Sequence, residues 1–254
     1  EQIKMLRTYL DGIRTKLLAL TGRSHIERSE DCVLYYCRTR AEYHQTMASV
    51  LGLKELPNSL FGGGSGENPR RIFGAADIGV GSLGHEFVCY NIRQDWDKAP
   101  SEVQYSIACT YTSVSVPVHN QKKIINNIYL FMAKRLLQQG DAFSLADLLA
   151  GKITGMGEVR PFGDESFLKV RAEKIYMTML AQWLNKRENL SDFYRNLRDG
   201  GEPKEVLEKL CQEPLDDIEK QIRTWLKNYP EEALIIPDPE QEQHNLPQLP
   251  GDDF

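Results

Sequence analysis

Apolar residues recur every three or four positions in residues 1–20, a pattern that predicts a helix with one buried stripe. The stripe consists of Ile3, Leu6, Leu10, Ile13 and Leu17. The run Cys32–Cys37 is rich in β-forming side chains and predicts a buried strand. Thr39 and Glu42 form a capping box that opens a helix to about Leu51. This alternation of strand and helix predicts an α/β or α+β layer.

A glycine-rich loop and a series of helices follow. Residues 57–66 predict a plain turn, since no Gly-Lys-Ser/Thr follows to complete a phosphate-binding loop. Residues 71–74 predict a short strand, and two helices are expected over 78–96 and 101–114. The second half of the chain predicts only helices, until an extended tail rich in Pro, Gln, Glu and Asp begins at 229. The helices are expected over 124–139, 144–150, 166–187, 191–199 and 203–211, and from 214 onward.

Composition and charge narrow the classes of function. The 254 residues are enough for one large or two small domains with a real core. A formal net charge of −5 argues against nucleic acid as a partner, and no apolar run approaches the ~20 residues of a membrane span. The five cysteines show no zinc-ribbon spacing. Because the sequence begins with Glu1, we expect a processed chain or a fragment, with a secreted or cell-envelope location favoured.

The segment Gly84–Cys89 differs by one residue from the zinc-peptidase motif His-Glu-x-x-His. In that motif two histidines at i and i+4 share one helix face and bind Zn²⁺, and the glutamate is the general base. Here His85 and Glu86 match the motif, and Cys89 stands in place of the second histidine. The predicted helix that carries them follows a strand–helix–strand segment and precedes a second helix. Zinc peptidases of this class use the same layout.

The chain therefore resembles the gluzincin, or peptidase-MA-like, group of zinc metallopeptidases. Residues 83–88 resemble the metal helix of the family, and 99–108 resemble its Pro-x-Trp-Leu-x-Glu-Gly-Leu-Ala helix. The resemblance extends to the helical bundle that closes such domains, which corresponds here to residues 193–200, 203–210 and 218–226. The resemblance implies an α+β, zincin-like domain over 1–228, with a small N-terminal mixed sheet, two motif helices and a C-terminal helical bundle. A boundary near residue 80 separates the strand–helix half from the helical half, and 229–254 form the tail.

The resemblance assigns His85 as the first metal ligand and Glu86 as the general base. Cys89 replaces the second ligand, Tyr105 stands where a glutamate ligand is expected, and Glu102 falls where the family has tryptophan. A catalytic zinc site needs about three protein ligands and an open water position. Without the metal, Glu86 has no activated water to assist. We expect a catalytically inactive domain without a cofactor, whose cleft holds a peptide or protein segment along a sheet edge.

Other interpretations remain open. A zinc ion held by His85, Cys89 and Glu102 would make the chain an atypical metallopeptidase, because thiolate is a good zinc ligand. Cys109, expected in the cleft one turn beyond Tyr105, could form a disulfide with Cys89, or both could be buried free thiols. A Cys89 nucleophile with His85 as base lacks an evident orienting residue. The chain could also be a structural domain of a larger secreted or envelope protein.

Overall fold

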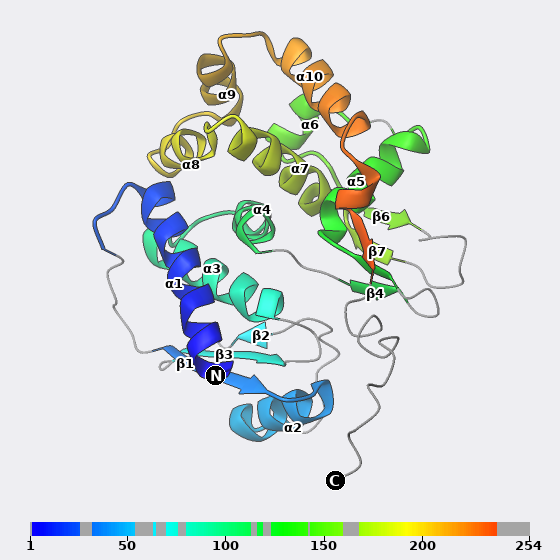
Figure 1. Cartoon of the computed structure of the whole chain (residues 1–254). Coiled ribbons are helices and arrows are strands. Elements are labelled where there is room, and N and C mark those ends of the chain that lie inside the picture. Colours follow the sequence, from blue (N-terminus) through cyan, green and yellow to red (C-terminus); the bar gives the residue numbers. More distant parts are fainter. Residues whose placement is uncertain are drawn as a thin grey trace, which may run out of the picture.

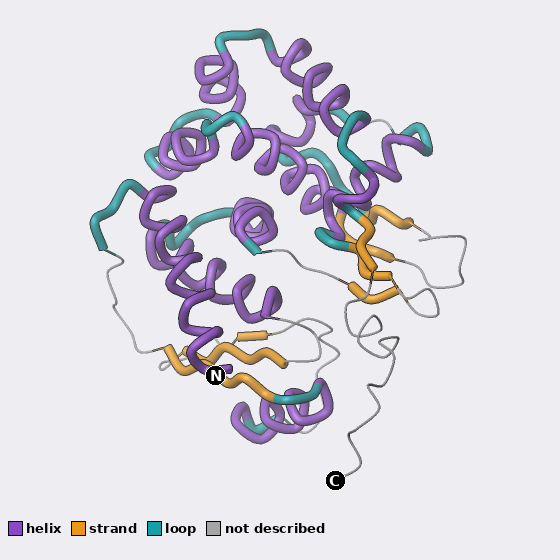
Figure 2. Tube along the Cα trace, viewed as in Figure 1, coloured by secondary structure: helices purple, strands orange, loops and turns teal. Residues whose placement is uncertain are grey.

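Helices predominate in the fold, and small sheets accompany them (Figure 1 and Figure 2). A computed structural model describes residues 2–25, 32–53, 63–64, 70–75, 80–112, 116–118, 123–141, 143–159 and 168–237. The expected combination of helices and strands is confirmed as a mixed α/β fold. Among the described helices, none is both long enough and apolar enough to cross a membrane.

The N-terminal part of the fold is a mixed sheet flanked by helices. Its elements are α1 (Gln2–Thr21), β1 (Cys32–Cys37), α2 (Arg40–Leu51), β2 (Gly63–Gly64) and β3 (Arg70–Ala75). The strand order is β1-β3-β2, with β1 parallel and β2 antiparallel to β3. The small mixed sheet expected at this end is thus present. Most of the loop predicted over 57–66 lies outside the described residues.

Both faces of this sheet are covered by helices. Phe73 packs with Tyr43 of α2 on one face, whereas Ile72 packs with Leu83 and Tyr90 of α3 (Val80–Asp95) on the other. Successive strand residues point to opposite faces, so the neighbours Ile72 and Phe73 serve different layers. Figure 1 shows α2 on one side of the sheet and α1 with α3 on the other.

Gly84 lets α1 and α3 approach each other closely. A Cβ at this position would lie 2.5 Å from Tyr9 Oη and 2.9 Å from Ile13 Cδ1. A larger residue would fit there only if the side chains of Tyr9 and Ile13 moved. The contact fixes the first turns of α3, directly before His85. The next helix, α4 (Ser101–Tyr111), then packs against both α3 and α7.

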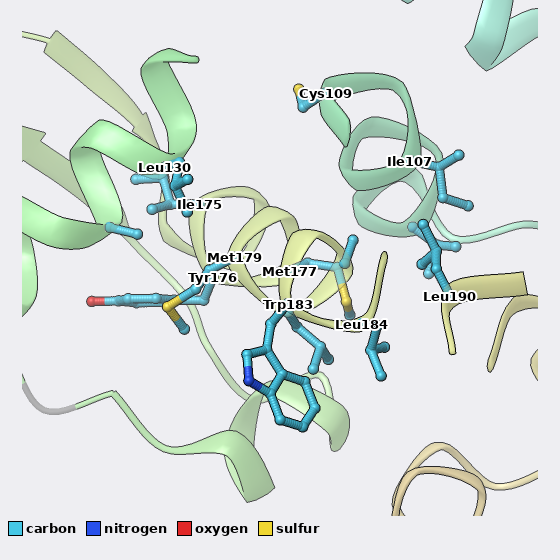
Figure 3. Packing of buried hydrophobic residues seen from close by; sticks show 14 of the residues in the cluster. Ile107, Cys109, Leu130, Ile175, Tyr176, Met177, Met179, Trp183, Leu184 and Leu190 are labelled. Atoms are coloured by element: carbon cyan, nitrogen blue, oxygen red, sulfur yellow. The ribbon is translucent and has the colours of Figure 1, made fainter. Parts of the chain in front are cut away.

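The second part of the fold is arranged around α7 (Ala172–Lys186). Its other helices are α5 (Ile128–Gln138), α6 (Leu145–Leu149), α8 (Leu190–Arg198), α9 (Pro203–Cys211) and α10 (Leu215–Lys227). α7 contacts α4, α5, α6, α8 and α10, and lies among them in Figure 1. Figure 3 shows Met179, Trp183 and Leu184 of α7 within the buried packing around this helix. The predicted C-terminal group of helices is therefore observed.

The expectation that the second half of the chain is wholly helical is wrong. The structure contains β4 (Val116–Val118), β5 (Lys123–Ile125), β6 (Met156–Val159), β7 (Leu168–Arg171) and β8 (Ile235–Pro237). β5 pairs antiparallel with β4 and β8, and β6 pairs antiparallel with β7. Such short strands do not show a period of two that stands out from helical spacing. The helices expected from 124 and 166 consequently begin later, at Ile128 and Ala172.

The first residues of the tail expected from residue 229 are folded. Residues Glu231–Ala233 form a 3₁₀ turn, and β8 then joins β5. Leu234 between them is only 1% exposed. Burial of this apolar residue and the pairing of β8 with β5 hold the segment on the domain. The polar residues around Leu234 made the segment resemble a disordered tail in the sequence. Residues 238–254 lie outside the described part of the chain.

Candidate functional site

Three helices each contribute two side chains, four residues apart, to one largely buried polar cluster. The pairs are His85 and Cys89 on α3, Tyr105 and Cys109 on α4, and Lys174 and Thr178 on α7. Residues four apart lie on the same helix face. Because α4 packs against both α3 and α7, the three pairs meet. We call these six residues the His85 cluster.

His85 makes the central contacts of the cluster. Its Nδ1 lies 3.7 Å from Cys109 Sγ, within the range of a thiol hydrogen bond. The imidazole packs edge-on against the Tyr105 ring, with 4.9 Å between ring centroids and 63° between planes. Lys174 Nζ lies 3.5 Å from the centroid of the same Tyr105 ring, a cation–π contact. A line of contacts thus runs from Cys109 through His85 and Tyr105 to Lys174.

Burial makes His85 a neutral imidazole at physiological pH. Desolvation is the main cause, and the positive charge of Lys174 adds to it. Together they lower the pKa of His85 from 6.5 to about 4. Burial also lowers the pKa of Lys174, and the nearby Arg171 charge acts in the same direction. The polar groups of the cluster are therefore held in an environment that disfavours added positive charge.

The two cysteines of the cluster are buried free thiols. Burial raises the pKa of the Cys109 thiol well above its ordinary value, and the neighbouring Cys89 adds to the rise. A side-chain hydrogen bond with Thr178 acts in the opposite direction. Cys89 Sγ lies 3.9 Å from the carbonyl oxygen of Gln104 and donates to it. The disulfide interpretation is thus not what the structure shows, and the thiol that contacts His85 is Cys109, which the cysteine-nucleophile interpretation did not include.

The two glutamates of interest lie at different places. Glu86 is half-buried, and its charge contributes to the raised pKa values of Tyr105 and Tyr129, so its carboxylate lies near both rings. Glu102 is half-buried in the first turn of α4, where it accepts a hydrogen bond from Ser101 Oγ at 3.3 Å. Glu86 therefore belongs to the surroundings of the His85 cluster.

The residues around His85 do not fit a zinc ion. Zn²⁺ is held by thiolates, neutral imidazoles and carboxylates, and the ring that packs against His85 is that of Tyr105, which is none of these. The charge of Lys174, close enough to lower the pKa of His85, would repel a divalent cation there. Across the described ranges, no three His, Cys, Asp or Glu side chains are grouped so that they could hold a metal ion. The set His85, Cys89 and Glu102 is therefore not assembled there as one donor group.

Sequence reasoning missed Lys174, Thr178 and Tyr129. Lys174 and Thr178 are four residues apart within a helix whose positions are mostly apolar, so their spacing was a signal of a polar contact on one face. Tyr129 carried no such signal. It lies on α5, which follows β4 and β5 in the chain, and these two strands were not predicted. Placement of these residues depends on the packing of α7 and α5, which local sequence does not specify.

Comparisons with known proteins do not assign the chain to a family. Protein-family models, curated protein sequences and solved structures all give no match to the chain. The resemblance to zinc peptidases rests on the residues at 83–88 and 99–108.

Proposed function

We propose that the chain is a catalytically inactive, zinc-peptidase-like domain that binds a peptide or protein segment. The observation that supports this proposal is the stack of Lys174, Tyr105 and His85. If α3 corresponds to the metal helix, the metal position lies beside His85 and toward α4. Tyr105 stands there instead of a carboxylate, and Lys174 places a positive side chain behind it. An ammonium group thus takes the place of the metal charge.

Metal analysis of the purified chain tests the loss of the metal. We expect far less than stoichiometric zinc after exposure to excess Zn²⁺ and dialysis, with no difference between the wild type and His85→Ala. A triple variant, Cys89→His with Tyr105→Glu and Lys174→Met, restores the donor set of the resembled family and is expected to gain zinc. Stoichiometric zinc in the wild type that disappears in His85→Ala would contradict the proposal.

The edge strand β2 is the proposed surface for the peptide. β2 lies at one edge of the order β1-β3-β2, and Gly63 and Gly64 carry no side chains that would obstruct an added strand. An edge strand presents backbone N–H and C=O groups that an extended peptide can pair with. Such binding needs neither a metal nor a nucleophile, so it agrees with the cluster chemistry.

Selection of random-sequence peptides displayed on phage, followed by affinity measurement for a selected peptide, tests this surface. In an antiparallel pair, hydrogen-bonding groups alternate between the two sides of the strand. One of the two variants Gly63→Pro and Gly64→Pro is therefore expected to remove an outward N–H and weaken peptide binding. Gly12→Ala, on α1, is the matched control. Unchanged affinity in both proline variants would exclude β2 as the binding edge.

A further inference from the structure

A cavity lies between α7 and α10, apart from the His85 cluster. It has a volume of about 480 Å³, which falls in the usual range for small-molecule sites. Its walls include Trp183, Lys186, Arg187, Lys220 and Trp225. In Figure 3, Trp183 lies on the opposite side of α7 from Cys109. Since a helix rises about 1.5 Å per residue, the step from Lys174 to Lys186 along α7 is on the order of 18 Å.

Two indole rings supply the apolar part of this cavity. Trp183 is 3% exposed, and the Arg187 guanidinium lies over its ring, with 4.6 Å from Cζ to the centroid. Trp225 is half-buried and packs edge-on against Tyr229 at 5.5 Å between centroids. Trp225 Nε1 is buried and has no hydrogen-bond acceptor among the described residues. Because Arg187 covers the Trp183 ring, the aromatic surface open to a ligand is that of Trp225, which favours a planar, apolar ligand body.

The rim of the cavity is positively charged. Lys186, Arg187 and Lys220 line it, and none of the lining residues is acidic, although the whole chain has a net charge of −5. Lys220 pairs with Asp217 at 2.8 Å. Arg187 donates from Nη1 to the amide oxygen of Gln221 at 3.0 Å. Within the described part of the chain, neither Lys186 nor Arg187 has a carboxylate partner, so two cations are available to an anionic group.

We propose that this cavity binds a small aromatic anion, a planar apolar body that carries a carboxylate or similar acidic group. The ring system packs against Trp225, and the anionic group accepts hydrogen bonds from Lys186 and Arg187, whose guanidinium lies over Trp183. A small rotation of Trp225 would offer its indole N–H the acceptor that it lacks. The site is independent of peptide binding at β2, because the two share no residue.

Nuclear magnetic resonance of the ¹⁵N-labelled full chain tests the proposal with 2-naphthoate as the probe. The chain has three tryptophans, and Trp96 packs on Tyr194 away from this cavity. The variants Trp96→Phe and Trp225→Phe assign the three indole N–H signals. We expect saturable shifts of the Trp183 and Trp225 signals and an unchanged Trp96 signal. The neutral analogue 2-naphthamide is expected to bind about tenfold more weakly or worse, because it lacks the charge-assisted hydrogen bonds.

Variants of the rim separate this site from nonspecific binding. The exposed pair Lys186→Gln and Arg187→Gln, combined, is expected to weaken 2-naphthoate binding by about tenfold or more, while the fold stays intact by circular dichroism. Lys152→Gln, an exposed cation after α6, is the matched control and should not change the affinity. Absence of indole shifts at millimolar probe, or equal binding by the double variant or by the amide, would overturn the proposal. An oligoglutamate peptide that shifts the same signals when 2-naphthoate does not would overturn it in favour of an acidic protein partner.

Discussion

The two ends of α3 hold buried polar groups in opposite ways. At the C-terminal end, the carboxylate of Asp95 is 5% exposed and pairs with Arg198 at 3.0 Å. Arg23 forms a second ion pair with the same carboxylate, and Tyr194 Oη donates to it at 2.8 Å. This buried charge has opposite charges and a hydroxyl donor around it. Through these contacts α3 is joined to the end of α1 and to α8.

Near the other end of α3, His85 has no oppositely charged partner among the described residues. Its contacts are a thiol and a tyrosine ring, and the charge of Lys174 opposes its protonation. The comparison distinguishes a structural contact from a candidate site. A buried ion pair with all partners present maintains the fold, whereas groups with shifted pKa values and mismatched neighbours concentrate at functional sites.

The largest expected effect on stability is at the C-terminal end of α3, where Asp95 has its charged partners. Asp95→Ala leaves two arginines and a tyrosine hydroxyl without their shared acceptor, so we expect a loss of about 3–5 kcal/mol in the free energy of unfolding. Urea denaturation measures it. The control is Asp199→Ala, which removes a carboxylate 3.0 Å from Arg198 that is 67% exposed, and should cost less than about 1 kcal/mol. Equal losses in the two variants would remove the distinction between the ends of α3.

The next largest effect is a dependence of stability on pH that comes from His85, near the N-terminal end of α3. Because the pKa of His85 falls from 6.5 to about 4 on folding, the unfolded chain takes up this proton first as the pH falls. The His85 contribution to stability is therefore complete above pH 6.5 and is lost as the pH falls toward 4. One pKa unit corresponds to about 1.4 kcal/mol, so the loss is about 3 kcal/mol.

Denaturation series between pH 7 and pH 4 in the wild type and His85→Gln measure this contribution. Lys174, Tyr105 and the two thiols face His85 from the packed helices, and of these groups only the histidine is expected to change charge in this range. Glu86 beside the cluster and the carboxylates elsewhere are present in both proteins, so the difference between the two slopes measures the His85 contribution. Identical slopes would show that the imidazole is not buried as described.

A third change tests how α3 is positioned. Gly84→Ala places a methyl group 2.5 Å from Tyr9 Oη, so the Tyr9 and Ile13 side chains must move, and we expect a loss of about 1–3 kcal/mol. Gly12→Ala is the matched substitution, since a Cβ at Gly12 meets no atom within 4 Å. There the better helix propensity of alanine should increase stability by about 0.5–1 kcal/mol. Thermal unfolding distinguishes the two signs, and a neutral Gly84→Ala would contradict the close helix contact.

Local signals account for what was predictable. Half of the predicted capping box of α2 is confirmed: Thr39 Oγ1 accepts from the Glu42 backbone N–H at 3.2 Å, whereas Glu42 Oε2 accepts from the backbone N–H of Arg38 at 2.8 Å. The bounds of α2 followed from this cap and from periodicity, whereas the starts expected at 124 and 166 were too early. The pairing of β5 with β8 joins residues far apart in the chain, so no local pattern revealed it. Two faces of the candidate site could be inferred, because their residues lie four apart on the neighbouring helices α3 and α4. The place of Lys174 beside them could not be inferred, because it depends on the packing of α7 against α4.

The smallest expected effect isolates the charge that distinguishes the two ends of α3. Lys174→Met keeps most of the side-chain volume and removes the positive charge, so the pKa of His85 should rise above about 4. It should remain below 6.5, because burial is the larger cause of the shift. Imidazole resonances followed by nuclear magnetic resonance measure this pKa, and the stability at neutral pH should change by less than about 1.5 kcal/mol. Lys152→Met, at an exposed position, should leave the His85 titration unchanged. If Lys174→Met does so too, the ammonium does not act on the imidazole, and the proposal that it replaces the metal charge loses its support.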